Sequence, residues 1–545
     1  MSGSMMERRT NMNDKIETKD FFKGAFILTL AGIFSKILSA GYRIPIQNIT
    51  GDLGFYIYQQ IYPFLGVAIM LSLYGFPVAV SKLAADFRDK QKELALRSFF
   101  IPVFVIIFSL SAVVFLILFT QAGMIAEWMG DKRLSSPIRA SALVFLVLPF
   151  TSVMRGAFQG SNDMQPTAVS QIVEQLVRVS IIITIAVALV GKEDYYAIGT
   201  GAAAASVAGS IAAAIFLGML AWKRRSREHY VHREHSYRYF LKTILIHGLF
   251  ISINYMFLLL IQMADAFTLV PGLEGFGLDS YEARVSKGVF DRGQPLIQLG
   301  AVLGSSLALA LIPTITKQRL EREPDKFHEH LQSALKMSLL LAAGATAGLI
   351  IIFPYVNELL YQNSNGTSYL RILMIVVLFS SLAITTSSVL QGVDVVFQTA
   401  GVILAGTVLK WAGNEILVPV FGLSGAAWAS VVAAALVLIW NLKLMRRRFR
   451  PSAWRSLPFI KILTALVVMA IFLMLAIIVE TYLLLLESRF GLLIFTLSVS
   501  GLGGIIYFIT FTLVKGFTDK EMEQIPAVGA IFNWFSRRKH KHAHH

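Results

Sequence analysis

The sequence predicts an all-α integral membrane protein with 14 transmembrane helices: two parallel six-helix repeats around a central cavity, plus two additional C-terminal helices. Three observations carry this prediction: the composition, the long apolar runs and an internal duplication. Of the 545 residues, 55% are hydrophobic and only 15% are charged, whereas soluble proteins carry about 25% charged residues. The composition therefore disfavours a soluble enzyme.

Apolar runs long enough to cross a bilayer recur along the whole chain. A helix needs about 20 mostly apolar residues to span the hydrocarbon. The first run follows a charged start, but it is too long for a removed signal peptide and lacks a small-residue cleavage site. The predicted spans are 21–44, 54–80, 98–121, 138–160, 167–190, 199–222, 241–270, 286–316, 330–353, 368–391, 397–418, 423–445, 459–484 and 491–514.

The 49 Lys and Arg residues, which give a net charge of +16, are distributed unevenly between the predicted loops. Cytoplasmic loops of membrane proteins are enriched in these residues. With the N-terminus inside, 35 of the 49 cations fall in cytoplasmic segments, 6 in outer loops and 8 within spans. This predicts a bacterial inner-membrane protein with cytoplasmic tails at 1–20 and 515–545. The charge requires no nucleic acid, and the basic loops are expected to lie on anionic lipids.

An internal duplication groups the first twelve spans into two sets of six. Gln159-Gly160 and Thr167-Ala168 recur as Gln391-Gly392 and Thr399-Ala400, an offset of 232 that also pairs Arg178 with Lys410. Six is even, so both copies share one orientation, as in transporters whose halves enclose a site near the bilayer midplane. The predicted parts are an N-lobe (21–222), a basic interlobe loop (223–240), a C-lobe (241–445) and the last two helices (446–514).

The eight cations within spans are the candidates for ligand binding, because charge in the hydrocarbon is costly and usually faces a cavity. Lys36 and Arg43 share a face of the first span, two helical turns apart, and Arg292 lies beside Asp291. If these cations converge with Arg178 and Lys410, the cavity selects an anionic headgroup, for which Arg provides a bidentate fork.

Structural alternatives exist for several of these charges. Arg43 and Arg155 lie near predicted span ends, where a long side chain can extend to the membrane interface. Arg178 follows Glu174 by four residues, the spacing of an intrahelical ion pair. Asp265 could bind a driving cation, take up a proton, or neutralise a cavity Arg.

Four features together resemble the multidrug/oligosaccharidyl-lipid/polysaccharide flippase superfamily, in its polysaccharide-transporter branch, which includes the lipid II flippases. They are the fourteen spans, the duplication with two added helices, Ser35-Lys36-Ile37-Leu38, and Phe290-Asp291-Arg292. The resemblance covers residues 20–515. It implies alternating access, with an undecaprenyl-pyrophosphate-linked saccharide (lipid II or another envelope precursor) moved from the inner to the outer leaflet.

The resemblance also implies roles for particular residues. Lys36, Arg43 and the Asp291-Arg292 pair stand at or near positions that hold the pyrophosphate, whereas the second span has Gln59 and Gln60 in place of the family's Arg. Some members use a sodium site between helices 7 and 11. Asp265 is compatible with such a site, and Lys410 could supply a fixed positive charge in place of the ion.

Two other functions compete with this hypothesis. A cation-coupled drug or metabolite exporter of the same superfamily is expected to face its cavity with acids, whereas the first span carries cations. A glycosyl transferase or polymerase needs reactive carboxylates or histidines on long loops, and no such set stands out. Cysteine is absent, which excludes disulfides and thiolate sites. We predict no catalytic residue, bound metal or cofactor, while coupling to Na⁺, H⁺ or the membrane potential stays open.

Overall fold

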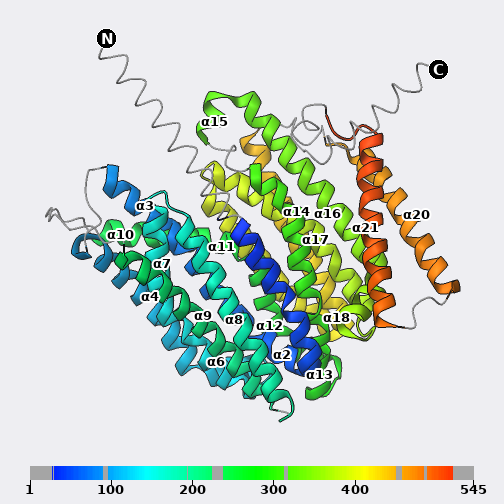
Figure 1. Ribbon diagram of the computed structural model, residues 1–545, viewed down its shortest axis with the longest axis horizontal. Helices are drawn as coiled ribbons and strands as arrows, with labels where there is room; N and C mark the ends of the chain where they lie inside the picture. The colour runs from blue at the N-terminus through cyan, green and yellow to red at the C-terminus, as the bar shows by residue number, and fades with distance from the viewer. Residues whose placement is uncertain are drawn as a thin grey trace. The chain divides into compact units, whose positions relative to one another are not determined.

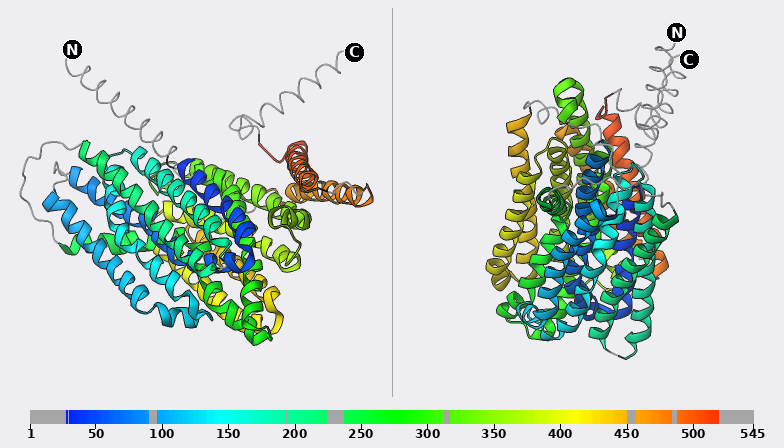
Figure 2. Two further views of the ribbon diagram at one scale, coloured as in Figure 1. Left: turned by 60° about the horizontal axis from the view of Figure 1, so that its bottom comes forward. Right: turned by 90° about the vertical axis from the view of Figure 1, so that its left-hand side faces the viewer.

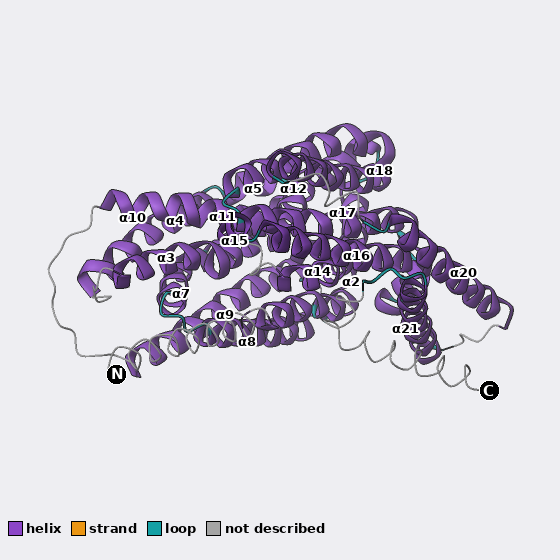
Figure 3. Cartoon of the chain, turned by 90° about the horizontal axis from the view of Figure 1, so that it is seen from above, coloured by secondary structure: helices purple, strands orange, loops and turns teal. Residues whose placement is uncertain are grey.

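The computed structural model describes residues 28, 30–89, 96–192, 194–223, 237–311, 317–449, 457–483 and 488–518. The predicted tail at 1–20, most of the interlobe loop and the end of the C-terminal tail lie outside these residues. Within them every regular element is a helix, and Figure 3 shows no strand. The all-α class predicted from the sequence is confirmed.

The described chain divides into two compact units. Unit 1 comprises Met1–Leu299, Ser368–Leu373 and Val395–Val437, and unit 2 comprises Gly300–Thr367, Met374–Asp394 and Leu438–His545. This division follows packing, and it leaves the lobe boundaries derived from the repeat as a prediction.

Unit 1 begins with a helical segment at 30–41. Its further helices are α2 (Arg43–Met70), η1 (Leu71–Gly75), α3 (Phe76–Asp89), η2 (Leu96–Phe100), α4 (Ile101–Thr120), α5 (Ala122–Trp128), η3 (Lys132–Leu134), α6 (Ser135–Ala142), α7 (Val144–Gln159), α8 (Gln165–Val190), α9 (Tyr195–Lys223), α10 (Tyr237–Thr243), η4 (Ile244–Leu249), α11 (Phe250–Tyr255), α12 (Phe257–Phe276) and α13 (Ser280–Asp291). Helix α2 packs on α8, α9, α12 and α13, as Figure 1 shows.

Three helices contribute residues to both units: α14 (Gly293–Leu311), α17 (Thr367–Gly392) and α18 (Val396–Arg448). Unit 2 also contains α15 (Lys317–Arg322), α16 (Pro324–Tyr361), α20 (Phe459–Leu483) and α21 (Arg489–Leu513). The last two, predicted to lie outside the duplication, run side by side in Figure 2 and both pack on α16. There the Tyr507 hydroxyl donates to the Leu340 carbonyl at 2.9 Å.

The described residues contain 11 helical stretches long and apolar enough to span a membrane. Val396–Arg448 contains two of the predicted spans, and Leu30–Phe87 contains one, 54–80, and the later part of another, 21–44. The predicted span at 286–316 is described only in part. The structure therefore confirms a multi-pass architecture, while the count of fourteen and the sidedness of the termini stay predictions.

Glycines break the two longest stretches where the sequence predicts connections. Gly51 has φ 66° and ψ −172°, and Gly422 has φ 57° and ψ −142°. Side chains with a Cβ adopt such backbone angles only at a cost of about 1–3 kcal/mol. Gly51 thus separates the first span from the second and places Asp52 at the start of the second.

We predict that Gly51→Ala lowers the thermal unfolding temperature of the detergent-solubilised protein, because its backbone strain is about 1–3 kcal/mol. Gly401→Ala is the matched control, since open space surrounds both positions but Gly401 lies within α18 without a positive φ. The control is expected to match or exceed wild type, because Ala favours helix. Equal unfolding temperatures for the two variants would contradict the prediction.

Candidate functional site

A pocket with both polar and apolar lining residues lies within unit 1, between the helical segment at 30–41, α2, η1, α8 and the first turns of α14. The space between its lining atoms is about 440 Å³, including the part open to solvent. One face of α8 contributes Gln171, Glu174, Gln175 and Arg178 to the wall. Residues three, four and seven positions apart lie on the same face of a helix. The other polar lining residues are Ser35, Lys36, Ser39, Tyr62, Tyr74 and Gln298.

The charge on the pocket wall is positive. Within the described part of the chain, Lys36 makes no ion pair, and Arg178 donates to the neighbouring Gln175 amide oxygen. Glu174 is the single carboxylate on this wall among the described residues. Its charge is already matched by another residue, Arg155, which lies outside the pocket. Two cations therefore remain to meet a ligand.

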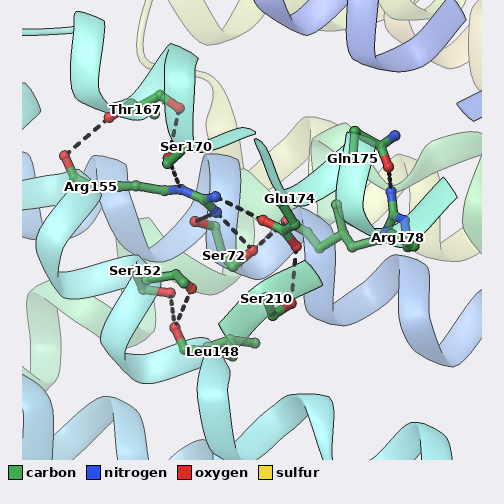
Figure 4. Close-up of polar contacts among 12 residues, drawn as sticks. Ser72, Leu148, Ser152, Arg155, Thr167, Ser170, Glu174, Gln175, Arg178 and Ser210 are labelled. Atoms are coloured by element: carbon green, nitrogen blue, oxygen red, sulfur yellow. Dashed lines mark hydrogen bonds and ion pairs between the residues drawn. The ribbon is translucent and has the colours of Figure 1, made fainter. Parts of the chain in front are cut away.

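Arg155 holds Glu174 in a buried ion pair of 2.7 Å between Nη2 and Oε2 (Figure 4). Arg155 also donates to the Ser170 hydroxyl at 3.0 Å, and Ser210 donates to the other Glu174 oxygen at 3.0 Å. Arg155 is completely buried. Its expected extension to the membrane interface is therefore wrong, as is the intrahelical pairing of Glu174 with Arg178.

Arg43 lies beside the pocket wall. Its guanidinium stacks on the Tyr62 ring, with Cζ 3.8 Å from the ring centroid. The side chain is completely buried, so it does not extend to the interface either. None of its three guanidinium nitrogens has a hydrogen-bond partner among the described residues. Because Tyr62 lines the pocket, Arg43 contacts the pocket wall through the Tyr62 ring.

Arg292 forms a bidentate ion pair with Asp52. Its Nε and Nη2 atoms lie 2.9 and 2.7 Å from Oδ1, and Nη2 lies 2.6 Å from Oδ2. The neighbouring Asp291 pairs with Lys287 one turn earlier at 2.5 Å. Sequence reasoning missed Asp52, which reads as part of a short connection. The one available signal was an acid directly after a glycine between two apolar runs.

Lys410 forms a buried ion pair with Asp265 across α12 and α18, at 2.7 Å. Its ammonium also donates to the Asn414 side-chain oxygen at 2.8 Å and to the Ala426 carbonyl at 2.9 Å. Asn414 in turn donates to Asp265 at 2.9 Å and to the Thr268 hydroxyl at 2.7 Å. All three donor positions of the ammonium are thus used.

Of the predicted binding residues, Lys36 and Arg178 line the pocket, while the others lie elsewhere in unit 1: Arg43, Asp291, Arg292 and Lys410. A role of these four in binding stays a prediction. Among the described residues no group of three or more His, Asp or Glu side chains is placed to hold a metal ion.

The chain is thus a multi-pass helical protein with a charged pocket between its helices, and comparisons with known proteins define its class and family. Residues 21–319 match the polysaccharide biosynthesis protein family, to which the chain belongs. Its relatives and structural neighbours are members of the multidrug/oligosaccharidyl-lipid/polysaccharide superfamily, as the motifs of spans 1 and 8 predicted. These proteins are transporters and flippases rather than enzymes.

The chain is 38% identical over 536 residues to the uncharacterized membrane protein YabM of Bacillus subtilis (strain 168), covering 97% of this chain and 99% of YabM. It is 25% identical to the lipid II flippase MurJ of the same organism, covering 78% and 82%. A solved MurJ structure in an inward closed conformation superposes with a TM-score of 0.62 at 15% identity, covering 91% of this chain and 98% of that one. An inward-facing multidrug MATE transporter superposes with a TM-score of 0.60 at 16% identity, covering 77% and 96%.

We predict that Asp265→Asn destabilises the protein by about 3–5 kcal/mol, because it leaves the Lys410 ammonium buried without its counter-charge. Glu127→Gln is the control. Glu127 pairs with Lys132 at 2.9 Å, but the two side chains are 60% and 77% exposed, and such pairs contribute about 0–1 kcal/mol. Thermal unfolding in detergent measures both. Similar unfolding temperatures would show that the Lys410 pair does not stabilise the fold.

Proposed function

We propose that the protein is a flippase for an anionic lipid-linked saccharide, an undecaprenyl-pyrophosphate-linked envelope precursor. The observation that supports this proposal most directly is the net positive wall of the pocket, where Lys36 and Arg178 face the same space and the one carboxylate is paired with Arg155. Arg and Lys are the side chains that bind phosphate oxygens, through charge-assisted hydrogen bonds.

The polar neighbours of the two cations suit the saccharide. Three glutamines, at 171, 175 and 298, and the hydroxyls of Ser35 and Ser39 line the same space. Amides and hydroxyls both donate and accept hydrogen bonds, as sugar hydroxyls do. The polyprenyl tail can stay in the lipid while the headgroup crosses through the pocket, which avoids moving bare charge through hydrocarbon.

A drug exporter of the same superfamily is the weaker candidate. A cationic drug requires an acceptor with unmatched negative charge, and Glu174 is occupied by Arg155 and Ser210. The relatives that this chain resembles over most of its length include a protein named for lipid II flipping. We infer that the cargo is moved by alternating access, from the inner to the outer leaflet.

Transfer by the purified protein in proteoliposomes tests the function. The substrate is a fluorescent undecaprenyl-pyrophosphate-linked saccharide, and a membrane-impermeant quencher reports its leaflet. We expect wild type to accelerate transfer, and we expect Lys36→Gln and Arg178→Gln each to slow it by about tenfold or more, the effect of losing one charge-assisted hydrogen bond.

Lys132→Gln is the matched control, because it removes a cation whose side chain is 77% exposed and outside the pocket. It should transfer the lipid at the wild-type rate. Wild-type transfer by both folded pocket variants would overturn the proposed function. A neutral lipid-linked saccharide transferred as fast as the anionic one would overturn the proposed selectivity.

The Lys410–Asp265 pair supports a proposal about whether Na⁺ drives transport. Because the Lys410 ammonium lies 2.7 Å from Asp265 Oδ1, a fixed positive charge stands where an acid would otherwise attract a cation. We infer that Asp265 is matched by this lysine and does not bind Na⁺.

We therefore predict that replacing Na⁺ with K⁺ or N-methyl-D-glucamine on both sides of the proteoliposome leaves the transfer rate unchanged. The physical reason is that a carboxylate already paired with an ammonium gains little from a second cation. Stopped-flow quenching at constant ionic strength measures the rate. A rate that rises and saturates with Na⁺ concentration would contradict the inference.

A further inference from the structure

Glu174 lies between two arginines, and it pairs with Arg155, the one that is more distant from it in sequence. Arg178 follows it by four residues on α8, the spacing at which helical ion pairs form. Instead, the Glu174 carboxylate forms an ion pair with Arg155 of α7 at 2.7 Å and accepts a hydrogen bond from the Ser210 hydroxyl of α9 at 3.0 Å. Figure 4 shows Arg155 and Arg178 on opposite sides of Glu174.

We propose that Arg155 is a positioning residue that sets the charge of the pocket: by holding Glu174, it keeps Arg178 available for the anionic headgroup. This inference rests on the proposed function. Arg155 does not line the pocket, and it acts only through the carboxylate that does.

The surroundings of Arg155 explain why Glu174 pairs with it. The Arg155 guanidinium is fixed by the Ser170 hydroxyl at 3.0 Å and by the Ser72 carbonyl at 3.3 Å. Arg155 is completely buried, and loss of Glu174 would leave its charge without a counter-charge. Arg178 has an alternative partner in Gln175 and borders the open pocket.

The packing of α9 on α8 supports the same arrangement. A Cβ on Gly209 would lie 2.6 Å from the Glu174 carbonyl oxygen and 3.2 Å from the Arg178 Cβ. The glycine thus allows α9 to approach α8 closely at this turn. The next residue, Ser210, donates to the second Glu174 oxygen at 3.0 Å, which adds a second contact to the carboxylate besides Arg155.

Loss of Arg155 would therefore change the pocket without removing any atom that lines it. Glu174 would lose its counter-charge, and Arg178 is the cation within reach on the same helix face. An ion pair between them would cancel the charge that Arg178 presents to the ligand. The effect depends on Glu174, so neutralising Glu174 should abolish it.

A double-mutant cycle on the purified full-length protein tests this dependence. The variants are Arg155→Gln, Glu174→Gln and the two combined, and the readout is the Kd for farnesyl pyrophosphate, a soluble anionic probe that carries a prenyl-linked pyrophosphate group. We expect Arg155→Gln to weaken binding by about tenfold, as loss of one charge-assisted hydrogen bond would. Glu174→Gln and the double variant should bind at least as tightly as wild type.

Arg155→Lys is the conservative control, because an ammonium keeps the pair with Glu174, and it should bind like wild type. Weak binding by the double variant would overturn the inference, since it would show that Arg155 is needed irrespective of Glu174. Where Arg155→Gln does not fold, the double variant still decides, because thermal unfolding identifies folded protein and its Kd is compared with that of Glu174→Gln.

The failure of this inference is distinguishable from failure of the proposed function. If Lys36→Gln and Arg178→Gln weaken probe binding while folded Arg155→Gln binds like wild type, only the positioning role of Arg155 is overturned. If the two pocket variants themselves bind like wild type, both the proposed function and this inference are overturned.

Discussion

The constraint on which this structure depends is that hydrocarbon offers no water to a buried charge, so the protein itself must supply partners for its buried charges. Four acids of unit 1 do so, each holding one cation: Glu174 with Arg155, Asp52 with Arg292, Asp291 with Lys287, and Asp265 with Lys410. Breaking such a pair costs far more than breaking an exposed one, because the partner left behind stays buried. The four pairs therefore identify cations whose charge is already matched within the protein.

Two cations without a carboxylate partner among the described residues, Lys36 and Arg178, line the pocket of unit 1 together with glutamines and serines. Arg43, which also lacks a carboxylate, stacks on the Tyr62 ring instead. A cation kept partly unpaired at the wall of a pocket is costly in the empty protein, and an anionic ligand offsets that cost on binding. The proposed selectivity for anions thus depends on the pairing of the acids as much as on the presence of the cations.

The fold could be predicted from sequence because its signals are local, whereas the pairing could not. Apolar runs and the recurring Gln-Gly and Thr-Ala positions lie within single stretches of chain. By contrast, Asp265 and Lys410 are brought together from helices far apart in sequence. The spacing of Glu174 and Arg178 even favoured the wrong partner, because no local rule reports that α7 presents Arg155 to the same carboxylate.

The predicted duplication pairs two positions whose surroundings differ in the structure. The offset of 232 residues pairs Arg178 with Lys410, and both are buried in unit 1 near an acid. Lys410 is matched by Asp265 and donates to two further oxygens, so it has no donor left for a ligand. At Arg178 the nearby acid is held by Arg155, and the cation borders the pocket. The nearby acid is thus paired with a third residue at one position and with the repeated cation itself at the other. This difference separates Lys410, which is held by its acid, from Arg178, the cation that we propose binds cargo.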